Sequence, residues 1–129
     1  MWPFFNALII KEDTMIFSES LKKNNDFRNV YENGKSYANK MIVVYVWENG
    51  SSSNRVGISC SKKIGNSVVR HRFARLVREA YRLHEDMFNS GLDIVVVARA
   101  CARDASFFDI EESLLFLAGK ARIKKNGGI

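Results

Sequence analysis

Apolar residues recur at helical spacing in several parts of the chain. Phe27, Val30 and Tyr31 stand at positions i, i+3 and i+4 ahead of Gly34, which predicts a short helix from Asp26 to Asn33. The longest periodic stretch predicts a helix from Ser67 to about Phe88, in which the apolar positions are Val69, Phe73, Leu76, Val77, Ala80 and Met87. One face of this long helix is therefore expected to pack on a core.

A last helix is expected from Phe107 to Arg122. Ser106 is a suitable N-cap because its hydroxyl can accept a hydrogen bond from the first turn. Acidic residues follow in the first turns and basic residues end the segment, namely Asp109, Glu111, Glu112, Lys120 and Arg122. This order of charge suits the helix dipole.

Three segments have the composition of strands. Met41 to Trp47 is β-branched and aromatic almost throughout, and Arg55 to Ser61 is bounded by loop residues on both sides. The polar stretch Glu48 to Asn54 separates them as a loop, so we expect the two strands to pair as an antiparallel hairpin. Leu92 to Ala98 contains a continuous apolar run, which is typical of a central strand buried on both faces. The local pattern thus gives the order αββαβα.

The length of 129 residues and the 47% hydrophobic content suit one domain with a real core. We place this domain at residues 18–123, between a disordered N-terminal extension, 1–17, and a flexible basic tail, 124–129. The apolar opening Met1 to Ile10 has no positive flank and is much shorter than the ~20 residues of a membrane span. It is expected to be neither a signal nor a span, and no membrane partner is expected.

The charge is concentrated in one segment. Eight Lys and Arg residues stand against Glu79 alone between Arg55 and Arg82, so this segment alone exceeds the net charge of +6 of the whole chain. On the long helix, four side chains fall within about 60° of one another, opposite the apolar face: His71, Arg75, Arg78 and Arg82. A solvated helix face usually alternates in sign, so we interpret this one as a surface for a polyanion such as nucleic acid.

Lys62 to Ser67 connects a predicted strand to the long helix. Gly65 and Asn66 suit a tight turn, and the free N–H groups at the start of the helix can bind an anion beside Lys62 and Lys63. The spacing is not that of a phosphate-binding Walker loop, which disfavours nucleotide hydrolysis. Contact with RNA phosphates is the better interpretation.

Aromatic residues cluster around the first helix and first strand: Phe27, Tyr31, Tyr37, Tyr45 and Trp47. Some must belong to the core. The tyrosines, however, suit a half-exposed surface on which unpaired bases of single-stranded RNA can stack.

Catalytic and metal-binding patterns are weak. Cys60 and Cys101 have no metal-ligand spacing and are expected to be buried, reduced thiols. His84 falls on the apolar side of the long helix as a core-edge residue, and the neighbouring carboxylates Glu85-Asp86 and Glu111-Glu112 diverge on a helix. We therefore expect neither a catalytic residue nor a metal site in this chain.

The run from Ser61 to Arg82, SKKIGNSVVRHRFARLVREAYR, closely resembles the signature of the protein component of bacterial ribonuclease P. The segments Leu21 to Phe27, Gly34 to Ser36 and Arg55 to Ser59 add to the resemblance. It implies a single-domain α+β fold, a two-layer sandwich of order αβββαβα related to the second domain of ribosomal protein S5. A sheet of about four strands and a left-handed βαβ crossover, against the general rule, are part of that fold.

The resemblance also implies a function. Such a protein binds a catalytic RNA, one to one, in the cytoplasm, and this RNA with Mg²⁺ hydrolyses precursor tRNA at its mature 5′ end. The ion is held mainly by the RNA, and none by the protein alone. The residues expected to contact the RNA are Lys62, Lys63, Asn66, Arg70, His71, Arg72, Arg75, Arg78 and Arg82. Phe27, Tyr31, Tyr45 and Ser59 are expected to form the cleft that holds the single-stranded 5′ leader.

Three positions depart from the family pattern: His71 replaces the usual Asn, Ala74 a usual Lys or Arg, and Ser20 a common Arg. Two other functions are open to the sequence. A general RNA-binding module, such as a ribosome-associated protein, needs the basic helix but not the aromatic cleft. A stand-alone nuclease needs a carboxylate cluster that the sequence does not offer.

Overall fold

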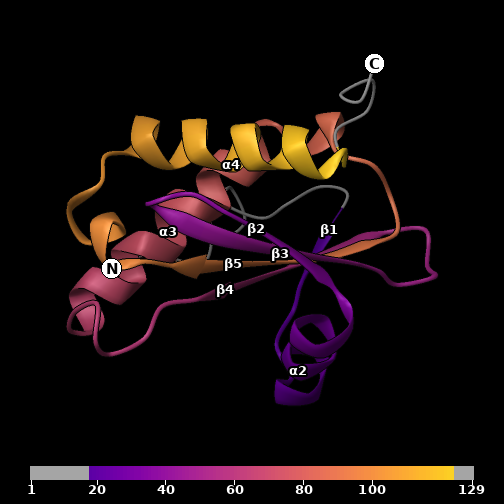
Figure 1. The fold of residues 1–129 in the computed structure, drawn as a ribbon, viewed down its shortest axis with the longest axis horizontal. Coiled ribbons are helices and arrows are strands. Elements are labelled where there is room, and N and C mark those ends of the chain that lie inside the picture. Colours follow the sequence, from indigo (N-terminus) through magenta and orange to yellow (C-terminus); the bar gives the residue numbers. More distant parts are fainter. Residues whose placement is uncertain (1–17, 124–129) are drawn as a thin grey trace, which may run out of the picture.

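The computed structural model describes residues 18–123 (Figure 1). The described residues contain five strands: β1 (Ser18–Ser20), β2 (Lys35–Ala38), β3 (Ile42–Glu48), β4 (Asn54–Ser59) and β5 (Leu92–Ala98). The helices are α2 (Asn24–Asn33), α3 (Ser67–Leu83) and α4 (Phe107–Ala121), with short 3-10 turns η1 (Glu85–Met87) and η2 (Ala100–Asp104). The predicted extension and tail lie outside the described residues.

The five strands form one sheet in the order β1-β4-β5-β3-β2. β5 is antiparallel to β3 and parallel to β4, with Val96 opposite both Val44 and Ile58. β5 is almost entirely buried, as its apolar run predicts, and it holds the central place. The handedness of the β4–α3–β5 connection stays a prediction.

The predicted hairpin between the first two long strands is wrong. β5 lies between β3 and β4, so the two strands that neighbour each other in sequence do not pair. The reason is hydrophobic burial: β5 is apolar on both faces and needs a strand on each side and cover above and below. A loop of five residues joins β3 to β4 without forcing them to be adjacent.

The sheet has five strands, against the four or so that the resemblance implies. The additional strand, β1, has three residues and pairs parallel to β4 at the edge. β2 is the strand that the local αββαβα pattern lacks. It is the first of the three strands between α2 and α3, as the implied αβββαβα order requires, and it pairs antiparallel with β3. Both strands are polar edge strands, so neither shows an apolar alternation in the sequence.

Two hydrophobic cores lie on opposite faces of the sheet. α3 and α4 pack together on one face and cover the main core, in which Phe73, Val77 and Leu114 meet the sheet residues Val44 and Val96. The pair of helices forms one layer and the sheet forms the other, as the expected two-layer sandwich requires. α2 lies on the opposite face, below the sheet in Figure 1, over a small core of Leu21, Val30 and Val95.

The long helix is shorter than predicted at its end. α3 begins at Ser67 as expected but ends at Leu83, and η1 follows before the buried Phe88. The His84 N–H bonds to the carbonyls of Tyr81 and Arg82, which tightens the last turn and redirects the chain. Met87 consequently lies 40% exposed instead of on the apolar face.

α4 begins with the predicted N-cap. The Ser106 hydroxyl accepts from the Asp109 N–H at 3.1 Å, and the Asp109 carboxylate accepts from the Ser106 N–H at 3.0 Å. This reciprocal capping box satisfies two N–H groups that have no partner within the helix. The prediction of a helix starting after Ser106 is confirmed.

The cysteines correct one expectation. Both are free thiols, but Cys60 is only half-buried and Cys101 is exposed. Cys101 lies in η2, a turn after β5 in which Ala102 is buried and Cys101 is exposed.

Candidate nucleic-acid interface

The turn before α3 presents the two predicted lysines. Lys62 and Lys63 are exposed, and the Ile64 N–H closes the turn on the Ser61 carbonyl at 3.0 Å. At Gly65 an added Cβ would lie 2.7 Å from the Val69 side chain, so this close approach needs a glycine. The turn and its lysines are called the basic turn below.

Asn66 is the N-cap of α3. Its side-chain oxygen accepts from the Val69 N–H at 3.1 Å. The residue is exposed, so its amide group stays accessible, but one of its hydrogen-bonding atoms serves the helix. A role in RNA contact would therefore come in addition to a structural one.

α3 turns its apolar side to the core and its basic side outward, as the sequence predicts. Phe73, Val77, Ala80 and Tyr81 are buried, while His71 and Arg75 are exposed and Arg78 and Arg82 are half-buried. The basic stripe below means these four residues: His71, Arg75, Arg78 and Arg82. Along α3 it presents first His71 and then Arg75 and Arg78. Its net positive charge is lower at Arg82, near the end of the helix.

That reduction comes from Glu79, which pairs with Arg82. The Arg82 Nη2 lies 2.6 Å from the Glu79 carboxylate, and its Nε donates to the other oxygen at 3.1 Å. The flanking arginines also differ from each other. Arg72 is exposed, whereas the Arg70 guanidinium donates to the Gly65 carbonyl at 3.0 Å and so ties α3 to the basic turn.

Two exposed arginines that the segment-wise charge count missed extend this basic surface. The Arg103 guanidinium donates to the Ile64 carbonyl of the basic turn at 2.8 Å. Arg99 donates to the Asn39 carbonyl at 3.0 Å, in the turn between β2 and β3. Both follow the end of β5, and only the sheet brings them to the same edge as the end of β4. The sequence feature that could have identified them is the position of arginines shortly after the buried strand β5.

The predicted aromatic residues meet on the α2 face of the sheet. The Tyr31 ring packs edge-on against Tyr45, with 4.9 Å between centroids, and lies 6.4 Å from the Phe27 ring. Tyr31 is 40% exposed, and the other two are half-buried. The three residues Phe27, Tyr31 and Tyr45 form the aromatic face.

A glycine lies beneath this face. A Cβ at Gly57 would be 2.7 Å from the Phe27 ring, so the ring rests directly on the backbone of β4. Ser59 is the last residue of β4, two positions after Gly57 and therefore on the same face. It is half-buried opposite Val97 of β5. The structure thus brings all four predicted cleft residues to one side of the sheet.

Two other aromatics are placed differently. Trp47 packs against the small core under α2, next to this face. Tyr37 lies opposite Val44 and packs against the main core on the other face, so it is separated from the aromatic face by the sheet. The alternation of side chains along β2 and β3 decides this, and it needs the register between the strands.

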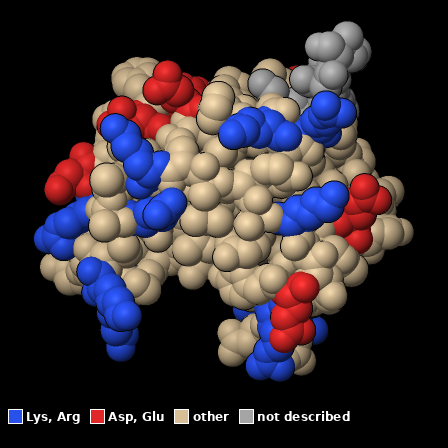
Figure 2. Space-filling model, viewed as in Figure 1, with Lys and Arg blue, Asp and Glu red and all other residues tan. Residues whose placement is uncertain are grey.

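The remainder of the α2 face is open. In Figure 2 the outline of the molecule is hollowed between α2 and the opposite end of the sheet. Uncharged side chains lie at the top of the hollow, and Lys and Arg side chains project on both of its flanks. Val43, Val97 and Ser59 lie on this side of the sheet and are half-buried, and Val97 packs against the small core under α2.

An ion-pair network fixes α2 over the sheet. Asp93 of β5 is fully buried, and Arg55 donates to both of its carboxylate oxygens, at 2.9 and 2.6 Å. The same guanidinium reaches Asp26 of α2 at 3.2 Å, and the Asn49 amide donates to Asp93 at 2.8 Å. The hydrogen bond to Asp93 raises the pKa of Arg55, so this arginine stays charged while it anchors the helix.

Titratable groups near the basic turn offer little reactivity. Burial raises the pKa of the Cys60 thiol, and the nearby Arg70 charge only partly opposes this, so the thiol stays protonated at neutral pH. His84 bridges to Glu111 of α4, with 2.8 Å between Nε2 and the carboxylate.

Residues 18–123 contain no group of three or more His, Cys, Asp or Glu that could hold a metal ion. Within the same range, no helix is long and apolar enough to cross a membrane.

Comparison with known proteins places this arrangement in one family. The family model described as Ribonuclease P matches residues 15–122. The chain is 58% identical over 101 residues to the "Ribonuclease P protein component" of Lachnoclostridium phytofermentans, covering 78% of this chain and 87% of that protein. The chain belongs to the ribonuclease P protein family.

Solved structures agree with the family assignment. The Staphylococcus aureus RNase P protein structure at 2.0 Å has a TM-score of 0.75 and 38% identity, over 81% of this chain and 95% of that one. A Staphylococcus aureus RNase P protein mutant with defective mRNA degradation activity has a TM-score of 0.76 and 35% identity, over 95% and 99% of the two chains. The resemblance drawn from the signature and the predicted α+β fold are confirmed.

Membership of the ribonuclease P family defines the general role. The chain is a protein component of a tRNA-processing nuclease, and its partner in the holoenzyme is an RNA. Which residues contact which part of the RNA stays a prediction.

Proposed function

We propose that this chain binds the catalytic RNA of ribonuclease P through α3 and holds the 5′ leader of precursor tRNA on the aromatic face. The observation that carries the proposal is the placement of the two surfaces. The basic stripe lies on the solvent side of α3, while Phe27, Tyr31 and Tyr45 lie together on the opposite side of the sheet. One protein can therefore contact two RNA segments at once.

The basic stripe and the basic turn suit a folded RNA. Arg72, Arg75, Lys62 and Lys63 are exposed, and Glu79, the one acidic residue in the sequence between Arg55 and Arg82, pairs with Arg82. Guanidinium groups bind phosphates through paired N–H donors, and displaced counter-ions supply much of the affinity. We assign this surface to the catalytic RNA, in a one-to-one complex in the cytoplasm.

The aromatic face suits a single strand. Tyr31 is partly exposed beside Tyr45, and the half-buried Ser59 lies on the same side of the sheet. Stacking of an unpaired base on an aromatic ring contributes about 1–3 kcal/mol and tolerates any sequence. A leader differs in sequence between precursor tRNAs, so stacking with few base-specific contacts fits its recognition.

Hydrolysis is assigned to the RNA. The described part of the chain has no cluster that fits a metal ion, so the magnesium ions that the reaction needs are proposed to be held by the RNA. The protein contributes by positioning: it fixes the leader relative to the RNA and neutralises phosphate repulsion between the two.

Reconstitution tests this function. Cleavage of a precursor tRNA is measured at low magnesium with a bacterial ribonuclease P RNA, with and without the protein, next to a protein-only reaction. We expect cleavage at the mature 5′ end only when both components are present. If the protein binds RNA and adds nothing to cleavage, it is a general RNA-binding module and the proposal fails.

The leader surface has a test of its own. Phe27→Ala and Tyr31→Ala should each lower the affinity of the holoenzyme for precursor tRNA about tenfold, because one stacking contact is lost. Affinity for mature tRNA, which has no leader, should not change. Phe108→Ala is the matched control, since Phe108 is 75% exposed on α4, away from the aromatic face. An equal loss for both tRNAs would contradict the assignment.

A second activity is favoured by one comparison. The Staphylococcus aureus relative was solved as a mutant with defective mRNA degradation activity. We propose cleavage of mRNA as the alternative for this chain, and the protein-only reaction tests it with an mRNA substrate. Degradation by the pure protein, absent after removal of the basic stripe, would support it. Intact mRNA would exclude it.

A further inference from the structure

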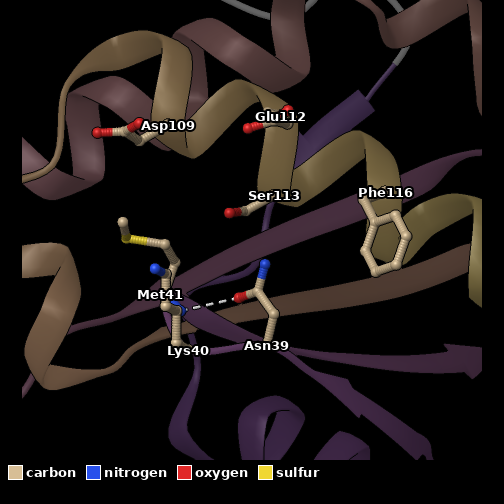
Figure 3. A pocket seen from close by; sticks show the side chains of 7 residues that line it. All are labelled: Asn39, Lys40, Met41, Asp109, Glu112, Ser113 and Phe116. Carbon is tan, nitrogen blue, oxygen red and sulfur yellow. Dashed lines mark hydrogen bonds between the residues drawn. The ribbon is translucent and has the colours of Figure 1, made fainter.

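A pocket lies on the α4 side of the molecule, away from the aromatic face. Its volume is about 360 Å³. The turn between β2 and β3 forms one wall, through Asn39, Lys40 and Met41, and the side of α4 that faces this turn forms the other (Figure 3). None of these residues belongs to the basic stripe, the basic turn or the aromatic face.

Asn39 has a fixed orientation at the edge of this pocket. Its side-chain oxygen accepts from the N–H groups of Met41 and Ile42, at 2.9 and 3.0 Å. Because the oxygen is occupied by the turn, the side-chain NH₂ is turned toward α4, as Figure 3 shows. The pocket therefore offers one directed hydrogen-bond donor.

Ser113 offers an acceptor on the facing wall. Ser113 is only 6% exposed, and its hydroxyl makes no hydrogen bond to any residue of the described part of the chain. In Figure 3 the hydroxyl points into the space between α4 and the turn. A buried hydroxyl normally has a partner, because leaving it unpaired costs stability. The unmet hydrogen bond points to a bound group.

Acidic side chains gather at the same place. Figure 2 shows them over the first half of α4, although the whole chain carries a net charge of +6. Asp109 lines the pocket but serves the capping box, whereas the exposed Glu112 has no ion pair among residues 18–123. Glu112 is thus the carboxylate available to a ligand, and Lys40 lines the same pocket.

An aromatic ring completes the wall. Phe116 lines the pocket and is 58% exposed. The Lys120 ammonium already lies 5.5 Å from the centroid of this ring, so the ring accepts a cation on one side. A carboxylate, a hydroxyl oxygen and an aromatic surface together match a planar cation with several N–H donors.

We propose that this pocket binds an arginine side chain of a protein partner. The guanidinium donates to Glu112 and Ser113 and stacks on Phe116, and the aliphatic part of the side chain packs on Met41. The main-chain carbonyl of the arginine accepts from the Asn39 NH₂. An ammonium ion cannot stack in this way or pair with a carboxylate through two parallel donors, so arginine is favoured over lysine. The proposal does not depend on how the chain binds RNA.

The experiment is a titration of the ¹⁵N-labelled protein with N-acetyl-arginine methylamide, followed by NMR. We expect saturable shifts at the amides of Asn39, Ser113 and Phe116 with a Kd of about 1 mM, as suits a ligand of this size. N-acetyl-lysine methylamide should bind at least about fivefold more weakly. Guanosine, added separately, tests for a nucleobase in the same pocket.

Three variants separate binding from folding. Glu112→Gln and Phe116→Leu should each weaken binding about tenfold, while Glu32→Gln, an exposed position on α2, should leave the Kd unchanged. Ser113→Ala should weaken binding without lowering the melting temperature, since it removes an unpaired buried hydroxyl.

Specific results would overturn the proposal. These are the absence of saturable shifts at 20-fold excess over the expected Kd of about 1 mM, equal binding by Glu112→Gln and Glu32→Gln, or saturation by guanosine in place of the arginine probe.

Discussion

Asp93 is a fully buried carboxylate in the central strand, and its hydrogen bonds come from Arg55 and Asn49. Replacing Arg55 by Met leaves this charge with the Asn49 amide alone. Removal of one partner of a buried ion pair is strongly destabilising, and because Arg55 is 31% exposed we expect a loss of about 2–3 kcal/mol in the free energy of unfolding. Urea denaturation at pH 7 measures it.

Two control variants test whether the loss of stability in Arg55→Met comes from the unpaired Asp93 charge: one removes that charge, and the other replaces an exposed arginine elsewhere on the protein. Adding Asp93→Asn to Arg55→Met should restore part of the lost stability, since the unpaired charge is gone. Arg28→Met, at an exposed position on α2, should change stability by less than about 0.5 kcal/mol. A loss at Arg55 no larger than at Arg28 would mean that the network does not hold α2.

Tyr81 makes stability sensitive to alkaline pH. Burial raises the pKa of its phenol above the ordinary value of 10.0, although the hydrogen bonds that it shares with Ser18 and Asn54 oppose this. The unfolded chain therefore ionises first, and stability present below pH 10 is lost as the pH rises through the folded pKa, by at most about 1.4 kcal/mol per pH unit. Tyr81→Phe should show a shallower decline between pH 9 and 11 in urea denaturation. Parallel declines would contradict this.

At the level of elements, Asn66 has two separable roles at the start of α3. Asn66→Ala removes the cap on the Val69 N–H and should cost about 1 kcal/mol of stability. Asn66→Asp keeps an N-cap and should preserve stability, but its negative charge should weaken binding to ribonuclease P RNA. Thermal unfolding and RNA titration of the two variants measure these effects. If Asn66→Asp binds RNA like the unmodified chain, Asn66 is a cap and not an RNA contact.

The main elements follow from local sequence. The start of α3, the whole of β5 and the start of α4 are where the apolar period, the continuous apolar run and the Ser106–Asp109 pair place them. β1 and β2 could not be found by apolar patterning, because short polar edge strands are stabilised by pairing with a neighbour and not by their own composition. The end of α3 was missed for a similar reason, since the buried Phe88 reaches the core after a turn.

For the molecule as a whole, the two surfaces proposed to bind RNA lie on opposite sides of one sheet and should act independently. Arg75→Ala should lower affinity for the RNA and reduce the slope of log affinity against log salt by about one unit, while Tyr31→Ala should leave that slope unchanged. In the double variant the free-energy losses should add within about 0.5 kcal/mol. Binding of precursor tRNA by the holoenzyme at several salt concentrations measures this.

Departure from additivity would show that the two surfaces are coupled. A loss in the double variant well below the sum would mean that both residues serve one contact. A Tyr31→Ala effect that depends on salt would place a phosphate, and not a base, on the aromatic face.

The sequence by itself determined the chemistry of this protein: a basic segment too rich in one sign to pair internally, aromatics near the first helix, and a signature that identifies the family. It also determined the long helices and the central strand, because their periodicity is local. Only the tertiary structure decided strand order, which separates β3 from β4, and strand register, which sends Tyr37 to one face and Tyr45 to the other. These depend on which apolar faces are buried together, and that competition is settled between segments far apart in the chain.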